Sequence, residues 1–180
     1  DLAVQQARAA VGQNTPDLVI HTTIDANVQQ AAARSIRARL GNRAFGRRPL
    51  QASFMALDRD GGIRGLIGGA DYGASQFDRV TQARRQPGSA FKIFVYTAAL
   101  ENGLDTEDVR YDEPVVIDGW RPHNYDDGYR GAITLRTAFA HSVNTVAAEI
   151  ASEIGPPRVA DVARRLGVAN MPERGQFVPP

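Results

Sequence analysis

The order of apolar and polar residues in the first forty positions predicts two helices with a strand between them. Residues 2–11 have the spacing of a short helix, and the partly alternating residues 18–23 indicate a strand. A second helix should begin after Asp25, a favourable N-cap residue, and run to about Leu40. The apolar stripe of this helix consists of Val28, Ala32, Ile36 and Leu40.

Two further apolar runs, residues 51–57 and residues 63–67, predict a β-hairpin. The residues between them, 58–62, have the composition of a turn, with two aspartates and two glycines. The aspartates lack the spacing and the final glutamate of an EF-hand calcium loop, so we interpret them as turn residues. The chain therefore predicts antiparallel β-structure after its second helix.

The strongest helix signal follows a Pro-Gly pair. Pro87-Gly88 interrupts the chain directly before Ser89, and residues 91–100 are apolar on nearly every side. A helix of this kind belongs in a core, and Asn102-Gly103 is a suitable end for it. We therefore expect Ser89 to stand at the beginning of a buried helix.

The remaining residues predict loops and then more helices. Residues 104–131 are rich in turn-forming residues and predict no regular element. Thr134 is a suitable cap for a helical region that reaches Ile154 with an interruption at 141–144. A last helix should run from Arg158 to Leu166. The pattern as a whole predicts a mixture of helices and antiparallel strands.

Composition and charge exclude several classes of function. The 180 residues are 43% hydrophobic and 23% charged, which is ordinary for a globular chain, and the net charge is +1. No overall field therefore attracts nucleic acid, and the arginines of 34–48 lack the aromatic residues of a nucleic-acid site. The absence of cysteine excludes disulfides, thiolate metal sites and a cysteine nucleophile. We expect no metal and no cofactor.

One detail of the composition points to chemistry. The chain contains 20 arginines and a single lysine, Lys92. Arginine remains protonated in proteins, whereas a crowded or buried lysine can lose its proton and act as a base. A need for surface charge explains the arginines but does not explain why one position carries lysine.

Ser89 and Lys92 are spaced for a reaction between a nucleophile and a base. Positions three apart lie on one face of a helix, so the Ser89 hydroxyl should lie near the Lys92 amine. Apolar surroundings should lower the pKa of Lys92, and the helix N-terminus can stabilise negative charge near Ser89. The alternative is that Ser89 is an ordinary helix cap, since the Ser-x-x-Lys spacing also occurs by chance.

Ser142 and Asn144 form a second candidate pair. A hydroxyl and an amide two residues apart can face one cleft, where they could relay a proton and hold a substrate amide. The alternative is that they only satisfy a break between two helices. The histidines at 21, 123 and 141 have no metal-ligand spacing, and we interpret them as structural or cleft-lining residues.

Taken in order, Ser89-Ala90-Phe91-Lys92 and Ser142-Val143-Asn144 resemble the first two motifs of penicillin-binding proteins. The surrounding residues are similar to class A, or bifunctional, members of that family over about residues 18–170. These residues are Thr22-Thr23-Ile24-Asp25, Gly68-Gly69, the run from Gln82 to Ser89, Thr134-Leu135-Arg136 and Asn144-Thr145.

The resemblance implies an α/β (α+β) fold in which an antiparallel sheet is flanked by helices. Residues 1–17 would be a linker into the domain, and residues 18–180 the N-terminal portion of a transpeptidase domain. The resemblance further implies a periplasmic or other extracytoplasmic location at the bacterial inner membrane, with membrane attachment only through an upstream anchor.

The resemblance also implies D,D-transpeptidation of peptidoglycan stem peptides through a serine acyl-enzyme, with β-lactams as inhibitors that acylate the same serine. Ser89 would be the nucleophile and Lys92 the base. Ser142 would pass a proton to the leaving amine, and Asn144 would bind the amide of the substrate or of the β-lactam side chain.

The family's third motif, Lys-Thr-Gly, has no counterpart, because the chain contains one lysine. The fold should therefore be incomplete at its C-terminal end, and the motif would come from a second chain or a further C-terminal segment. A β-lactamase or a D,D-carboxypeptidase is the alternative enzyme. A non-catalytic β-lactam sensor or a structural fragment is the alternative outside enzymes.

Overall fold

A computed structural model describes residues 2–12, 17–41, 44–45 and 48–169 of the chain. The chain forms two compact units, residues 1–85 and residues 86–180. No helix among the described residues has both the length and the apolar character needed to cross a membrane.

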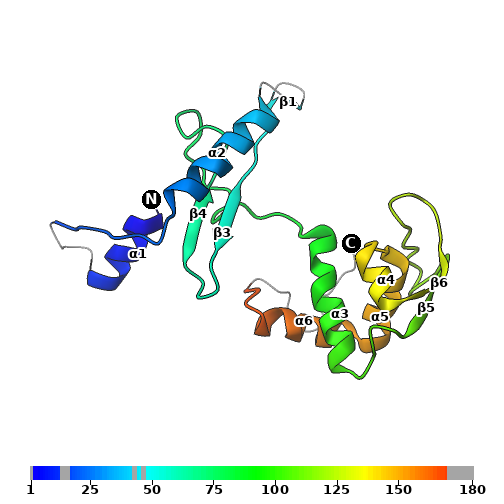
Figure 1. Cartoon of the computed structure of the whole chain (residues 1–180). Coiled ribbons are helices and arrows are strands. Elements are labelled where there is room, and N and C mark those ends of the chain that lie inside the picture. Colours follow the sequence, from blue (N-terminus) through cyan, green and yellow to red (C-terminus); the bar gives the residue numbers. More distant parts are fainter. Residues whose placement is uncertain (1, 13–16, 42–43, 46–47, 170–180) are drawn as a thin grey trace. The chain divides into compact units, whose positions relative to one another are not determined.

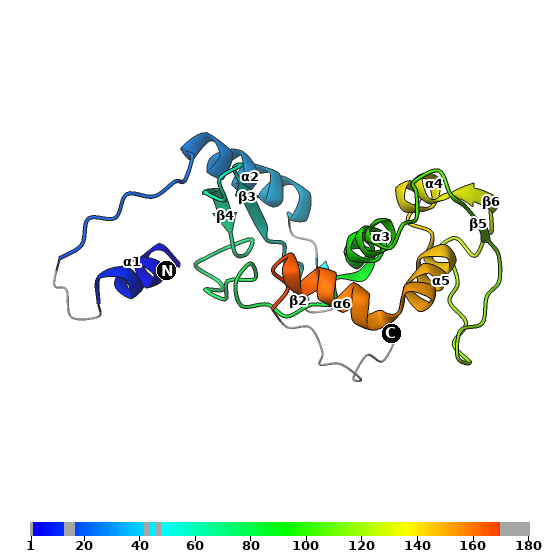
Figure 2. The same cartoon turned by 90° about the horizontal axis from the view of Figure 1, so that it is seen from below.

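The first unit combines a long helix with a β-hairpin, which lie side by side in both views (Figures 1 and 2). The hairpin is antiparallel, with Phe54 opposite Ile67, and Asp58 accepts hydrogen bonds from the amides of Asp60 and Gly62 in its turn. The predicted hairpin and the turn interpretation are thus confirmed. The elements are α1 (Leu2–Val11), α2 (Ala26–Leu40), β1 (Ala44–Phe45), β2 (Arg48–Pro49), β3 (Phe54–Leu57) and β4 (Ile63–Ile67).

Helix α2 begins and packs as its sequence predicts. The Asp25 side chain accepts hydrogen bonds from the amides of Asn27 and Val28, which satisfies donors that have no partner within the helix. Ala32 is buried at the centre of the predicted apolar stripe. The stripe faces strand β4, so the helix covers the hairpin with its less polar side.

The strand predicted over residues 18–23 is wrong. These residues form no strand, and Val19 is 87% exposed. The segment reaches β4 only at its end, where the Thr23 hydroxyl donates to Ile63 O and the Asp25 amide donates to Arg64 O. The Gln29 side chain then takes the next place along β4, so the segment forms no ladder of backbone hydrogen bonds.

The second unit is a small helical core beside a two-stranded sheet. Helix α3 packs against α5 and α6, and strands β5 and β6 pair antiparallel with Val109 opposite Thr134 (Figure 2). Neither strand was predicted from the local sequence pattern, because this segment is rich in turn-forming residues. The elements are a 3-10 turn η1 (Gly88–Phe91), α3 (Lys92–Glu101), β5 (Val109–Asp112), β6 (Gly131–Thr134), α4 (Leu135–Ala140), α5 (Asn144–Ile154) and α6 (Pro156–Arg165).

The apolar helix enters the core as predicted. Val95, Ala98 and Ala99 of α3 are buried against α5 and α6, whereas Ile93 on the other side is 51% exposed. Thr134 caps α4, and the predicted interruption separates α4 from α5. The last helix begins at Pro156 instead of Arg158. Proline is favourable in the first helical turn because it lacks the backbone N–H that would have no partner there. Together with the antiparallel hairpins, these helices confirm the expected α+β fold.

Candidate active site

Ser89 lies in the 3-10 turn that leads into α3. Gly88 has a φ of 55°, a left-handed conformation that glycine adopts without strain, and it turns the chain directly before the serine. In a 3-10 turn, residues three apart are eclipsed, so Ser89 and Lys92 share one side as the spacing predicts. Ser89 is exposed, and its hydroxyl can be reached by a substrate.

Lys92 is the first residue of α3 and is partly buried. Burial lowers the pKa of Lys92 from its ordinary value of 10.5, because a partly desolvated amine holds its proton less strongly. The expected effect of the apolar helix on the chain's one lysine is therefore present.

Ser142 occupies a backbone position that usually belongs to glycine. It follows the end of α4 with a φ of 54°. Its amide donates to Phe139 O and the next amide, of Val143, donates to Ala138 O, which is the hydrogen-bond pattern of a Schellman motif. Any residue with a side chain has a conformational cost in this left-handed position. A serine here therefore indicates a function for its hydroxyl.

Asn144 is the first residue of α5, and its amide group has a defined orientation. Its Nδ2 donates to His123 O at 2.9 Å, which directs Oδ1 toward Lys92. The Asn144 side chain is therefore held from two sides.

Lys92 joins the second candidate pair across 50 residues of sequence. Its Nζ donates to Ser142 O at 2.5 Å, to Ser142 Oγ at 3.0 Å and to Asn144 Oδ1 at 2.5 Å. Among the described residues, no hydrogen bond joins Lys92 Nζ to Ser89 Oγ. The structure thus places Lys92, Ser142 and Asn144 in direct contact, and Ser89 beside them.

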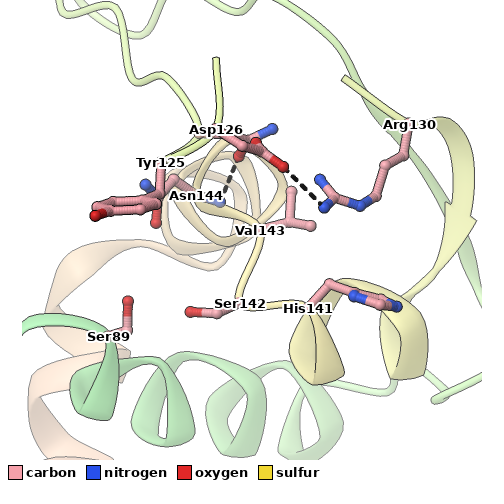
Figure 3. Close-up of a pocket in the computed structure, with 9 residues that line it drawn as sticks. Ser89, Tyr125, Asp126, Arg130, His141, Ser142, Val143 and Asn144 are labelled. Carbon is pink, nitrogen blue, oxygen red and sulfur yellow. Dashed lines mark hydrogen bonds and ion pairs between the residues drawn. The ribbon is translucent and has the colours of Figure 1, made fainter. Parts of the chain in front are cut away.

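Three of the four candidate residues, Ser89, Ser142 and Asn144, line one cavity of about 400 Å³, a volume suited to a small ligand or part of a peptide. In Figure 3, the Ser89 and Ser142 hydroxyls point into the same space. The two serines and Asn144 line the cavity, and Lys92 contacts two of these residues. The lining residues are Ser89, Asn124, Tyr125, Asp126, Arg130, His141, Ser142, Val143 and Asn144.

Several lining residues lie outside the two candidate pairs. Arg130 forms an ion pair with Asp126 at 3.2 Å (Figure 3), and Tyr125 is fully exposed. Asn124 is buried and donates to Asp112, a carboxylate on β5. Nothing in the local sequence pattern paired Asn124 with Asp112, because the two residues are 12 positions apart in a segment without a predicted element. The interpretation of His141 as cleft-lining is confirmed.

The arrangement contains chemical groups of the kinds that acyl transfer uses. An accessible hydroxyl, that of Ser89, lines the cavity, and an amine whose pKa is lowered contacts a second hydroxyl that lines the same cavity. No group of three or more histidine, cysteine or acidic side chains among the described residues could hold a metal ion.

Comparisons with known proteins agree with the motifs. Residues 52–176 match the family model of the penicillin binding protein transpeptidase domain. Penicillin-binding protein 1A of Rickettsia felis is 41% identical over 120 residues, which are 63% of this chain and 15% of that protein. Penicillin-binding protein 1A of Neisseria lactamica is 38% identical over 149 residues, which are 78% of this chain and 19% of that protein. The chain thus spans less than a fifth of the length of these relatives.

Solved structures agree as well. The PonA1 protein from Mycobacterium tuberculosis in complex with penicillin V matches with a TM-score of 0.83 and 29% identity, over 99% of this chain and 50% of that one. Penicillin-binding protein 1A from Haemophilus influenzae matches with a TM-score of 0.63 and 35% identity, over 70% of this chain and 21% of that one. Since the family model covers most of the chain and all four candidate residues, the chain belongs to the penicillin-binding protein transpeptidase domain family.

Proposed function

We propose that the protein containing this chain is a D,D-transpeptidase that crosslinks peptidoglycan stem peptides through an acyl-enzyme on Ser89. The contact of the single lysine with Ser142 and Asn144, beside the cavity that Ser89 lines, carries this proposal. Membership of the transpeptidase family and the likeness to PonA1, which was solved with penicillin V, support it.

The proposed reaction begins with a proton transfer to Lys92. As Ser89 Oγ attacks the carbonyl of the penultimate D-alanine, its proton passes to the neutral Lys92 amine. The tetrahedral intermediate then collapses with cleavage of the peptide bond. The Ser142 hydroxyl passes a proton to the leaving nitrogen, and terminal D-alanine departs. An amine of a second stem peptide attacks the ester and releases Ser89, which completes the crosslink. Water in place of this amine gives D,D-carboxypeptidation.

The three hydrogen bonds of Lys92 match the three hydrogens of an ammonium, and a neutral amine can keep all three contacts. A neutral amine has two hydrogens and one lone pair, and two of its partners, Ser142 O and Asn144 Oδ1, can only accept. The third partner, the Ser142 hydroxyl, can donate as well as accept, so it can direct its hydrogen to the lone pair of the lysine. The same contact provides a path for the proton between Lys92 and Ser142.

The proposed substrates and location follow from the same reaction. A β-lactam presents a strained amide that Ser89 opens, which leaves a stable ester on the serine. Asn144 holds the side-chain amide of the ligand. Because crosslinking takes place in the cell wall, we assign the protein to the extracytoplasmic face of the bacterial inner membrane, with an anchor outside this chain.

The proposal is tested by labelling the full-length protein with a fluorescent penicillin. We expect one label on the tryptic peptide that contains Ser89, located by mass spectrometry, and no label in Ser89→Ala. Ser152→Ala, at an exposed position on α5, is the matched control and should label like the unmodified protein. Labelling that persists in Ser89→Ala would overturn the assignment of the nucleophile.

A second assay separates the enzyme classes. The labelled protein is followed over hours, and the unlabelled protein is incubated with a stem pentapeptide and an acceptor amine. A transpeptidase keeps the penicillin ester and forms a crosslinked product that lacks one D-alanine. Rapid loss of the label with turnover of penicillin would indicate a β-lactamase instead.

A further inference from the structure

Asn124 is a buried polar residue whose side chain is fully engaged. It lies between β5 and β6 and is 3% exposed. Its Nδ2 donates to Asp112 Oδ1 at 2.7 Å and to Gly128 O at 2.8 Å, and its Oδ1 accepts from the backbone amide of Asn144 at 2.8 Å. Both hydrogens of the Asn124 side-chain amide and its oxygen thus have partners. Burial of this polar group costs little only while every one of these partners is present.

Asp112 determines which way the Asn124 amide points. This carboxylate is 0% exposed and accepts from Asn124, from the Thr145 hydroxyl at 2.6 Å and from the Arg130 amide at 2.9 Å. Burial would raise the pKa of Asp112, but these hydrogen bonds outweigh it and lower the pKa, so the group is ionised. Because an ionised carboxylate only accepts, the NH2 group of Asn124 must face it, and the oxygen faces Asn144.

The backbone amide of Asn144 needs Asn124 Oδ1 as its acceptor. Asn144 begins α5, so its amide has no acceptor within the helix, and the preceding Val143 has no side chain that could cap it. Asn124 thus caps α5 from a position 20 residues earlier. Thr145, the next residue of α5, donates directly to Asp112, so this carboxylate holds Thr145 directly and Asn144 through Asn124.

We propose that Asn124 is a positioning residue, anchored by Asp112, that holds the start of α5 so that Asn144 and Ser142 contact Lys92. The inference rests on the proposed function, because it makes acylation of Ser89 depend on a residue that the reaction itself does not use. The backbone of Asn144 is fixed by Asn124, and its side chain reaches Lys92 from that backbone.

The first test compares Asn124→Ala with Asn102→Ala in the full-length protein. Asn102 also bonds to the backbone through its side chain, but at the far end of α3. With a chromogenic β-lactam, we expect Asn124→Ala to acylate about 10- to 100-fold more slowly than the unmodified protein. Asn102→Ala should be unchanged. A rate for Asn124→Ala within about twofold of the unmodified protein would overturn the proposal.

Hydrogen exchange provides a readout that a general loss of stability would not reproduce. The Asn144 amide should lose protection in Asn124→Ala, whereas amides in the middle of α5 and α3 keep theirs. Exchange is measured by mass spectrometry with fragmentation that resolves Asn144. Unchanged protection of this amide would contradict the proposed cap, whatever the acylation rate.

A pair of charge variants keeps the proposal testable if Asn124→Ala folds poorly. Asn124→Asp retains an acceptor for the Asn144 amide but sets a second carboxylate against Asp112, and it should acylate slowly. Adding Asp112→Asn supplies a donor for the new carboxylate. We expect the double variant to recover the rate about fivefold or more over the single variant. A double variant slower than the single one would overturn the pairing.

The outcomes separate this inference from the proposed function. If the unmodified protein takes no label at Ser89, the proposed function fails, and the hydrogen-exchange comparison still tests the cap. If the unmodified protein is labelled and Asn124→Ala acylates normally, only the positioning role fails.

Discussion

At the scale of single residues, Lys92 carries the chemistry that the proposed function requires. It is the chain's one lysine, and burial lowers its pKa from 10.5. Since a base must be unprotonated, acylation should accelerate as the pH rises through this lowered pKa. The half-maximal rate should therefore lie below pH 10.5. Acylation rates of the full-length protein at a series of pH values provide the measurement.

The matching substitution is Lys92→Arg, which keeps the charge but cannot accept the proton. It should reduce acylation by about 100-fold or more and remove the rise with pH. A profile that is flat in the unmodified protein, or retained in Lys92→Arg, would contradict the role as base.

Ser142 shows a conflict between stability and activity at one residue. Its φ of 54° suits glycine, yet its hydroxyl contacts Lys92. Both Ser142→Gly and Ser142→Ala remove that hydroxyl, and both should acylate slowly. Only glycine adopts this left-handed conformation without strain, so Ser142→Gly should be more stable than Ser142→Ala by about 1 kcal/mol. Urea unfolding of both variants measures the difference, and equal stabilities would contradict the strain.

At the scale of elements, a side chain substitutes for a strand. Gln29 on α2 accepts from the Leu66 amide and donates to Leu66 O, both at 2.8 Å, so it satisfies the outer side of β4 where a backbone could have paired. Helix α2 is thereby attached to the hairpin at a defined register. This contact, together with those of Thr23 and Asp25, explains why the preceding segment is not a strand.

Gln29→Ala should therefore destabilise the first unit. It leaves the amide and carbonyl of Leu66 without partners in a partly buried position, which costs about 1–3 kcal/mol. Gln30→Ala, at an exposed position on the same helix, is the control and should change the free energy of unfolding by less than about 0.5 kcal/mol. Urea unfolding followed by circular dichroism compares the two variants. Equal losses in the free energy of unfolding would contradict the pairing of Gln29 with the Leu66 backbone.

At the scale of the whole molecule, both units belong to the family match. The matched range begins before β3 in the first unit and ends beyond α6 in the second. All four candidate residues nevertheless lie in the second unit, where Ser89 lies in the 3-10 turn before α3 and Lys92, at the start of α3, contacts the turn before α5. The core formed by Ala98, Val146 and Ile150 holds these elements together.

The sequence by itself determined the features that depend on neighbouring residues. The Ser89 and Lys92 spacing, the caps at Asp25 and Thr134 and the hairpin turn at Asp58 were all predictable, because each involves residues within one turn. The family resemblance named the reaction from the same short motifs. The spacing alone did not show that Lys92 reaches past Ser89 to a second motif.

Tertiary structure decided the contacts between distant residues. Lys92 meets Ser142 and Asn144 because α3 packs against α5, and Asn124 reaches Asn144 while its side chain donates to the buried Asp112. Such contacts depend on how whole elements pack, which no local pattern specifies. The predicted strand over residues 18–23 is absent for the same reason, because a strand needs a partner elsewhere in the fold. The available edge of β4 is paired with the Gln29 side chain.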